Sequence, residues 1–217
     1  MTMDRTLIAH RPAETPLDAY RDADTVLEGI LTVLAARDTS ALTAARATGA
    51  WSRRLATALH RSTASTELAE AAGLLHDIGE IATPETILFK PGPLTAEEWT
   101  VVRQHANAGA AILATLPSLA IYAPIVRAHH ERWDGSGYPL GLKGEAIPFE
   151  ARVVAVADAF HALITDRPHR PAFAQRDAIE ILRDGRATQW DAAIVDAILN
   201  LLDAPRTAAG RRYVAQR

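Results

Sequence analysis

The chain has 217 residues, a formal net charge of −3 and no cysteine, and 48% of its residues are hydrophobic. These values allow one compact domain with a substantial core, argue against nucleic acid as a partner, and exclude disulfides and thiolate metal sites. The chain shows neither a signal peptide nor a run of roughly 18 apolar residues, so we expect a cytoplasmic protein with no membrane contact.

Three helices are predicted in the N-terminal part of the chain. Apolar residues recur three and four positions apart over 17–36 and again over 41–60, which predicts two amphipathic helices. A third helix is predicted over 66–77, where it ends in the adjacent pair His76 and Asp77. Because few segments alternate as strands do, we expect an all-α fold.

A fourth helix is predicted to begin at Thr95, because Glu98 follows three positions later, as in a capping box. His105 falls on the face of this helix that we expect to be buried, and further helices are predicted over 118–130, 150–164, 174–184 and 190–203. The apolar residues expected on the same buried face are Trp99, Val102, Ile112, Leu113 and Leu116.

Residues 134–148, DGSGYPLGLKGEAIP, are expected to form a loop. They contain four glycines and two prolines, too many for a regular element. A loop of this length inside a compact domain is more often functional than not. We call this segment the glycine-rich loop and expect it to be ordered.

Several ionisable residues fall where the helical pattern predicts burial. Any one of them could be a histidine or aspartate satisfied inside the core, but together they form the ligand set that ions such as Mn, Fe or Zn accept. Neighbouring residues on a helix point about 100° apart, so the aspartate of an adjacent His-Asp pair can bridge two ions. The candidate ligands are His76, Asp77, His105, His129, His130 and Asp158.

The order of these residues, with the segments LLHDIGEIATP, HHERWDGSGYP and VADAFHALITDRPHR, resembles an HD-GYP domain. The resemblance covers residues 38–203 and leaves an N-terminal helical extension, 1–37, and a basic C-terminal tail, 204–217. It implies an HD-superfamily helical bundle and a phosphodiesterase that opens cyclic di-GMP to linear dinucleotide or GMP. The nucleophile implied is a hydroxide activated by one or two divalent ions, such as Fe or Mn.

The resemblance also implies roles for individual residues. Asp77 would bridge two ions, and catalysis would depend on Asp77 and His76. Asp158 would join His76 at one ion, and His105, His129 and His130 would complete the other. Substrate contacts would come from Arg167, Arg170 and Tyr138, and the glycine-rich loop would recognise a protein partner.

Three positions depart from the family pattern. Alanine stands at position 44, where the family places its first metal-binding histidine, and Ser40 replaces the glutamate of members with three ions. Glu80 stands where a lysine is usual. Glu80 either reaches the depleted ion from the His76 face of a continued helix, or lies in a turn after Gly79.

Three functions therefore stay open. The first is a phosphodiesterase with reduced activity, and the second is a catalytically degenerate module for nucleotide sensing or protein contacts. The third is an HD-type hydrolase of another phosphate ester. Dimerisation through the first helices is a further option for regulation.

Overall fold

The computed structural model describes residues 16–166 and 170–203, and these form an all-α fold, as predicted. No strand occurs among the described residues. The α-helices are α1 Pro16–Arg37, α2 Thr39–Ala58, α3 Thr63–Leu75, α4 Glu85–Leu88, α5 Ala96–Arg103, α6 His105–Ala114, α7 Ala123–Ala128, α8 Phe149–Leu163, α9 Gln175–Asp184 and α10 Ala192–Asp203. Short 3₁₀ helices cover η1 Ile78–Ala82, η2 Ala120–Tyr122 and η3 Gly144–Ala146.

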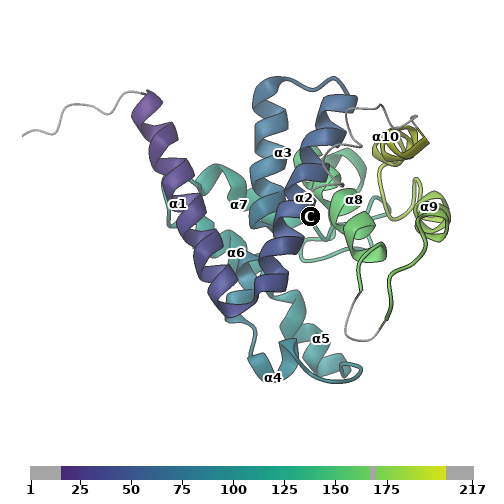
Figure 1. Cartoon of the computed structure of the whole chain (residues 1–217), viewed down its shortest axis with the longest axis horizontal. Helices are drawn as coiled ribbons and strands as arrows, with labels where there is room; N and C mark the ends of the chain where they lie inside the picture. Colours follow the sequence, from purple (N-terminus) through teal and green to yellow (C-terminus); the bar gives the residue numbers. More distant parts are fainter. Residues whose placement is uncertain (1–15, 167–169, 204–217) are drawn as a thin grey trace, which may run out of the picture.

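The paired helices α2 and α3 form the centre of the bundle, with α1 on one side and α9 and α10 on the other (Figure 1). Glycines allow this close pairing. A Cβ on Gly73 would lie 2.9 Å from Gly49 Cα, and a Cβ on Gly49 would lie 2.9 Å from the Leu74 side chain. Because α3 is held directly against α2, the His-Asp pair that follows Leu75 is placed on a rigid support.

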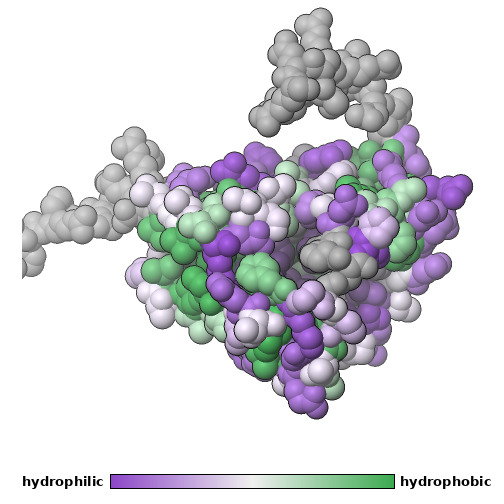
Figure 2. Space-filling model, turned by 60° about the horizontal axis from the view of Figure 1, so that its bottom comes forward, coloured by the Kyte–Doolittle hydropathy of each residue, from purple (hydrophilic) through white to green (hydrophobic). Residues whose placement is uncertain are grey.

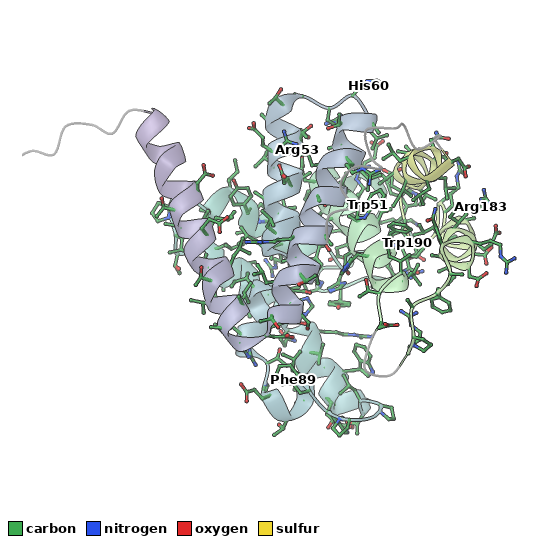
Figure 3. The ribbon with its side chains drawn as sticks, viewed as in Figure 1. Trp51, Arg53, His60, Phe89, Arg183 and Trp190 are labelled. Carbon is green, nitrogen blue, oxygen red and sulfur yellow. The ribbon has the colours of Figure 1, made fainter. Side chains whose placement is uncertain are left out.

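The buried apolar residues fall into separate clusters around this pair. One joins α2 to the C-terminal helices and contains Leu55, Phe160 and Ile194, all essentially inaccessible to solvent. Trp51 packs edge-on against Phe160, and Figure 3 shows Trp51 and Trp190 on the side of α2 that faces α9 and α10. A second cluster joins α1, α3, α6 and α7. The helices that carry the candidate ligands are therefore fixed by packing on both sides.

The prediction of a single helix from Thr95 onward is wrong, because the structure has two helices there. Thr95 and Glu98 do form the expected capping box, but the helix breaks at Gln104 into α5 and α6. The break directs α5 away from the core, beside α4 at the lower end of the molecule in Figure 1, so Trp99 is 49% exposed instead of buried. Figure 2 brings this end forward and shows polar and apolar side chains mixed around a hollow.

Other boundaries shift by a few residues. The predicted third helix ends at Leu75 and continues as η1, and the helix predicted over 118–130 consists of η2 and α7. Helix α9 ends before Gly185, as expected, and the glycine-rich loop contains only η3. No helix in the described part of the chain combines the length and apolar character needed to cross a membrane. The predicted tail, 204–217, lies outside the described residues.

Candidate metal centre

Four of the six predicted ligands meet in one place. One ligand atom from each of Asp77, His105, His129 and His130 lies within 4.8 Å of the other three, and we call this set the four-ligand cluster. Asp77 follows the end of α3, His105 begins α6, and the two other histidines follow the end of α7. Helix ends from three different elements thus bring together residues that are up to 53 positions apart in the sequence.

Backbone carbonyls orient the imidazoles of this region. Nδ1 of His76 donates to the Gly73 carbonyl at 2.9 Å, and Nδ1 of His105 and of His129 donate to carbonyls three residues earlier, at 2.8 and 2.6 Å. In a neutral imidazole this leaves Nε2 as a free lone pair. Nε2 of His105 and Nε2 of His129 face each other at 3.3 Å, an arrangement that a shared cation would stabilise.

The Asp77 carboxylate lies between two groups of histidines. Its Oδ1 is 3.4 Å from Nε2 of His105 and 3.8 Å from Nε2 of His129, while its Oδ2 is 3.0 Å from Nε2 of His76. Nε2 of His76 also lies 3.6 Å from Oδ1 of Asp158, so this buried nitrogen faces two carboxylates. Oδ1 of Asp77 therefore faces the histidines of the four-ligand cluster, whose donors suit a divalent ion, and Oδ2 faces His76.

The charges of these groups depend on their neighbours. Burial lowers the pKa of His130 to about 3, with the His105 imidazole adding to the effect, and burial lowers the pKa of His129 well below its usual value. Burial opposes the charged form of His76, but Asp77 and Asp158 outweigh it and raise the pKa of His76 well above its usual value. His129 and His130 are therefore neutral near pH 7, the form that binds metals.

The glycine-rich loop covers the cluster with Tyr138. The Tyr138 ring stacks on His130 with ring centres 4.8 Å apart, and the Tyr138 amide donates to the His130 carbonyl at 3.2 Å. Burial raises the pKa of the Tyr138 phenol, so this side chain stays neutral. Two further backbone bonds tie the chain just before and at the start of this loop to the turn between α9 and α10, from Trp133 to Gln189 and from Asp134 to Thr188.

Glu131 is a buried residue beside the cluster that the sequence prediction missed. It follows the histidine pair, is only 4% exposed, and its carboxylate accepts the amides of Leu140 at 2.6 Å and of Leu142 at 3.0 Å. The sequence gives no signal for this role, because the direction of the loop amides depends on the folded loop. Glu131 fixes the path of the glycine-rich loop and hence the position of Tyr138.

Two glycines allow close backbone contacts beside the cluster. A Cβ on Gly79 would lie 1.9 Å from the carbonyl oxygen of His105, so η1 packs directly on the start of α6. A Cβ on Gly137 would lie 2.3 Å from the amide nitrogen of Arg132, so the glycine-rich loop folds back onto its own beginning. Both positions need glycine for space.

Glu80 does not lie on a continued α3. The α-helix ends at Leu75 and Glu80 belongs to η1, so the expectation that it shares a helical face with His76 is wrong. The physical reason is the contact of Gly79 with α6, which redirects the chain. Glu80 is not among the residues of the four-ligand cluster, and its carbonyl accepts a bond from Arg37 at 2.7 Å.

The other predicted positions that the structure describes pack in a helix or make hydrogen bonds within the protein. Ala44 is a half-buried residue of α2, and Ser40 bonds through its amide and hydroxyl to Asp38, the N-cap of α2. Arg170 donates to the carbonyls of Ala162, Leu163 and Pro171, so its guanidinium braces the segment after α8. Arg167 lies outside the described residues, and the substrate-binding roles of both arginines stay predictions.

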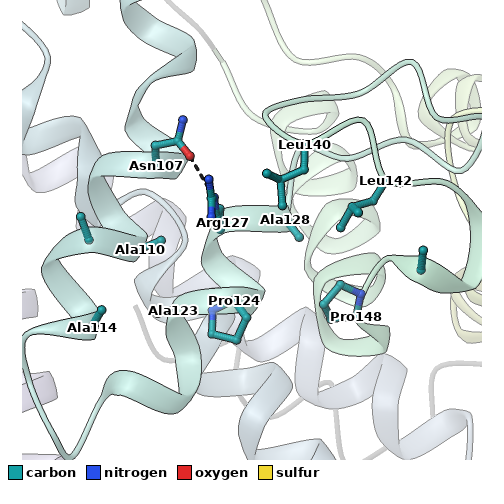
Figure 4. Close-up of a pocket in the computed structure, with 12 residues that line it drawn as sticks. Asn107, Ala110, Ala114, Ala123, Pro124, Arg127, Ala128, Leu140, Leu142 and Pro148 are labelled. Carbon is teal, nitrogen blue, oxygen red and sulfur yellow. Dashed lines mark hydrogen bonds between the residues drawn. The ribbon is translucent and has the colours of Figure 1, made fainter.

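A separate hollow of about 690 Å³ lies between α6, α7 and the glycine-rich loop (Figure 4). Its walls are mainly alanine side chains, with Leu140 and Leu142 from the loop, and Nε of Arg127 donates to Asn107 at 3.0 Å within it. None of the candidate ligands lines this hollow, which therefore lies apart from the metal centre.

Comparisons with known proteins agree with this geometry. The family model for the HD domain matches residues 30–194. A cyclic di-GMP phosphodiesterase of Vibrio cholerae is 44% identical over 140 residues, covering 61% of this chain and 28% of that protein. The 3'3'-cGAMP-specific phosphodiesterase 2 of the same organism is 35% identical over 167 residues, covering 73% of this chain and 32% of that protein. The chain thus spans about a third of the length of these curated relatives.

A solved structure shows the same fold. Bd1817, an HDG"Y"P protein from Bdellovibrio bacteriovorus, superimposes with a TM-score of 0.65 at 18% identity, over 87% of this chain and 64% of that one. At this identity the likeness concerns the fold alone. The match to the family model over residues 30–194, however, includes the His-Asp pair and the histidines that cluster with it, and so the chain belongs to the HD domain family, within its HD-GYP group.

Proposed function

We propose that the chain is a metal-dependent phosphodiesterase that opens a cyclic dinucleotide, with cyclic di-GMP as the first candidate. The observation that carries this proposal is the convergence of His105, His129, His130 and Asp77, whose ligand atoms lie within 4.8 Å of one another. The names of the similar proteins, which act on cyclic di-GMP or 3'3'-cGAMP, support the choice of substrate class.

Each residue of the site has a definite task under this proposal. His105, His129 and His130 would offer imidazole nitrogens to one ion. Oδ2 of Asp77 would bind a second ion, together with His76 and Asp158. A divalent ion bound there would polarise the phosphodiester and lower the pKa of a bound water. The backbone carbonyls that hold Nδ1 of His105 and His129 keep the Nε2 lone pairs aimed at the cluster before substrate arrives.

We propose Mn or Fe as the ion. We expect one ion position with four protein ligands and a second position with fewer ligands and lower affinity. The four-ligand cluster supplies four protein ligands to the first position. The second position has His76, Asp158 and the shared Asp77, and the methyl group of Ala44 adds no ligand. Reduced activity or a preference for one metal is the expected consequence.

The test is hydrolysis of cyclic di-GMP by protein reconstituted anaerobically with Mn or Fe, followed by chromatography, with metal-stripped protein as the control. Product should form only in the presence of metal. Asp77→Ala should abolish turnover, because both ion positions lose their shared carboxylate. Asp196→Asn is a matched control, since Asp196 is an α10 residue paired with Arg186 on the surface. Turnover that persists in Asp77→Ala would refute the mechanism.

A second function is favoured by Ala44. With one ligand missing, the same fold would serve as a nucleotide-binding module without turnover. Binding of cyclic di-GMP by the metal-loaded protein, with no product after prolonged incubation, would establish this alternative. Turnover of a different phosphate ester, but not of cyclic dinucleotides, would identify the third candidate, an HD-type hydrolase of another substrate.

A further inference from the structure

Arg103 lies beside the metal centre without a role in holding it. It is the last residue of α5, two positions before His105, and its side chain is exposed. Its guanidinium carbon lies 5.3 Å from the centre of the Tyr138 ring, and that ring stacks on His130. Arg103 thus contacts the same aromatic ring that stacks on a member of the four-ligand cluster.

The charge of Arg103 is not neutralised by the described part of the chain. Among the described residues, no carboxylate lies within ion-pair distance of it, and its contact is with the face of Tyr138. A cation–π contact of this kind orients a guanidinium but leaves its N–H groups available. Arg103 therefore presents donors for an anion near the metal centre.

Other cations of this region are engaged elsewhere. Arg37 donates to the carbonyls of Glu80 and Thr83, and Lys90 donates to the carboxylate of Glu98. Arg170 donates to the carbonyls of Ala162 and Leu163 at the end of α8 and of Pro171, and it lies over Phe173. Within residues 16–166 and 170–203, Arg103 is the cation at Tyr138 that keeps its fork of donors for a ligand.

We propose that Arg103 binds the second phosphate of a cyclic dinucleotide, the one that is not positioned for cleavage at the four-ligand cluster. This proposal rests on the proposed function. A cyclic dinucleotide carries two phosphates in one ring, and the contact with Tyr138, which stacks on His130, places the guanidinium near the cluster. A guanidinium fork suits paired phosphate oxygens, so Arg103 selects substrates with two phosphates over simple diesters.

The experiment compares two substrates with the manganese-loaded full chain. Cyclic di-GMP has two phosphates, and bis(4-nitrophenyl) phosphate has one. Arg103→Gln should lower kcat/KM for cyclic di-GMP roughly tenfold, mainly through KM, as expected for the loss of one charge-assisted hydrogen bond. Its rate on bis(4-nitrophenyl) phosphate and its manganese content should stay within twofold of wild type, and Arg103→Lys should recover part of the loss.

Arg183→Gln is the matched control, because Arg183 is an exposed arginine of α9 paired with Glu180 (Figure 3). Equal losses on both substrates, or a lower manganese content in Arg103→Gln, would overturn the proposal and show that Arg103 only supports Tyr138 and His130. Unchanged kinetics on cyclic di-GMP would also overturn it.

Binding of cyclic di-GMP, measured by calorimetry, separates this proposal from the proposed function. If the wild type binds cyclic di-GMP without hydrolysing it, the proposed function fails, and a tenfold weaker affinity of Arg103→Gln still supports the phosphate contact. Equal affinity of the two proteins would overturn the contact alone. If the wild type neither binds nor hydrolyses cyclic di-GMP, both are overturned.

Discussion

Replacing Glu131 by alanine should destabilise the protein by about 3 kcal/mol, because two hydrogen bonds to a buried carboxylate are lost at about 1.5 kcal/mol each. The bonds run from the amides of Leu140 and Leu142 at 2.6 and 3.0 Å, and Glu131 is 4% exposed, so water cannot easily replace the carboxylate. Glu131→Gln keeps one carbonyl oxygen as an acceptor and should lose about half as much. Urea denaturation measures the difference in the free energy of unfolding.

The same substitution should weaken metal binding, because Glu131 holds the loop that stacks Tyr138 on His130. Manganese affinity measured by titration should therefore fall together with stability. Glu145→Ala is the control, since Glu145 is an exposed residue of the same loop. A loss below about 0.5 kcal/mol for Glu131→Ala, a size typical of surface substitutions, would refute the assignment of Glu131 as the clamp of the loop.

Two further substitutions test neighbouring parts of the site. Gly79→Ala should cost at least about 2 kcal/mol in urea denaturation, because its Cβ would lie 1.9 Å from the His105 carbonyl oxygen, and wild-type stability would contradict the close contact. Ala44→His should raise the manganese content toward two ions per chain, measured by elemental analysis, and an unchanged content would count against placing position 44 among the ligands.

Local chemistry made part of the fold predictable. The capping box of Thr95 and Glu98 depends on four consecutive residues, and the structure contains it. The break at Gln104 was missed because the apolar pattern continues across it, from Val102 to Ile112, although the backbone changes direction. The exposure of Trp99 follows from that break, which is a tertiary effect and leaves no mark in the periodicity.

The candidate site could likewise be predicted from the sequence only in part. The residues now found in the four-ligand cluster could be selected as a set, because His and Asp at inward positions of several helices have few other uses. Their metal-binding roles stay predictions. Glu131 could not be found, because its partners are amides whose direction depends on the folded loop. Of the two alternatives for Glu80, the one that assumed a continued helix failed, because the packing of Gly79 on α6 ends that helix early.

The backbone bonds from Trp133 to Gln189 and from Asp134 to Thr188 connect the surroundings of the candidate metal centre to the C-terminal helices. The amide of Tyr138, in the loop that begins at Asp134, donates to the His130 carbonyl. Hydrogen bonds therefore link the α9–α10 turn, through this loop, to a candidate metal ligand. Thermodynamic linkage makes this connection reciprocal. A partner that bound α9 and α10 and moved their turn would therefore be expected to change the affinity for metal, and metal would then change the affinity for that partner by the same factor.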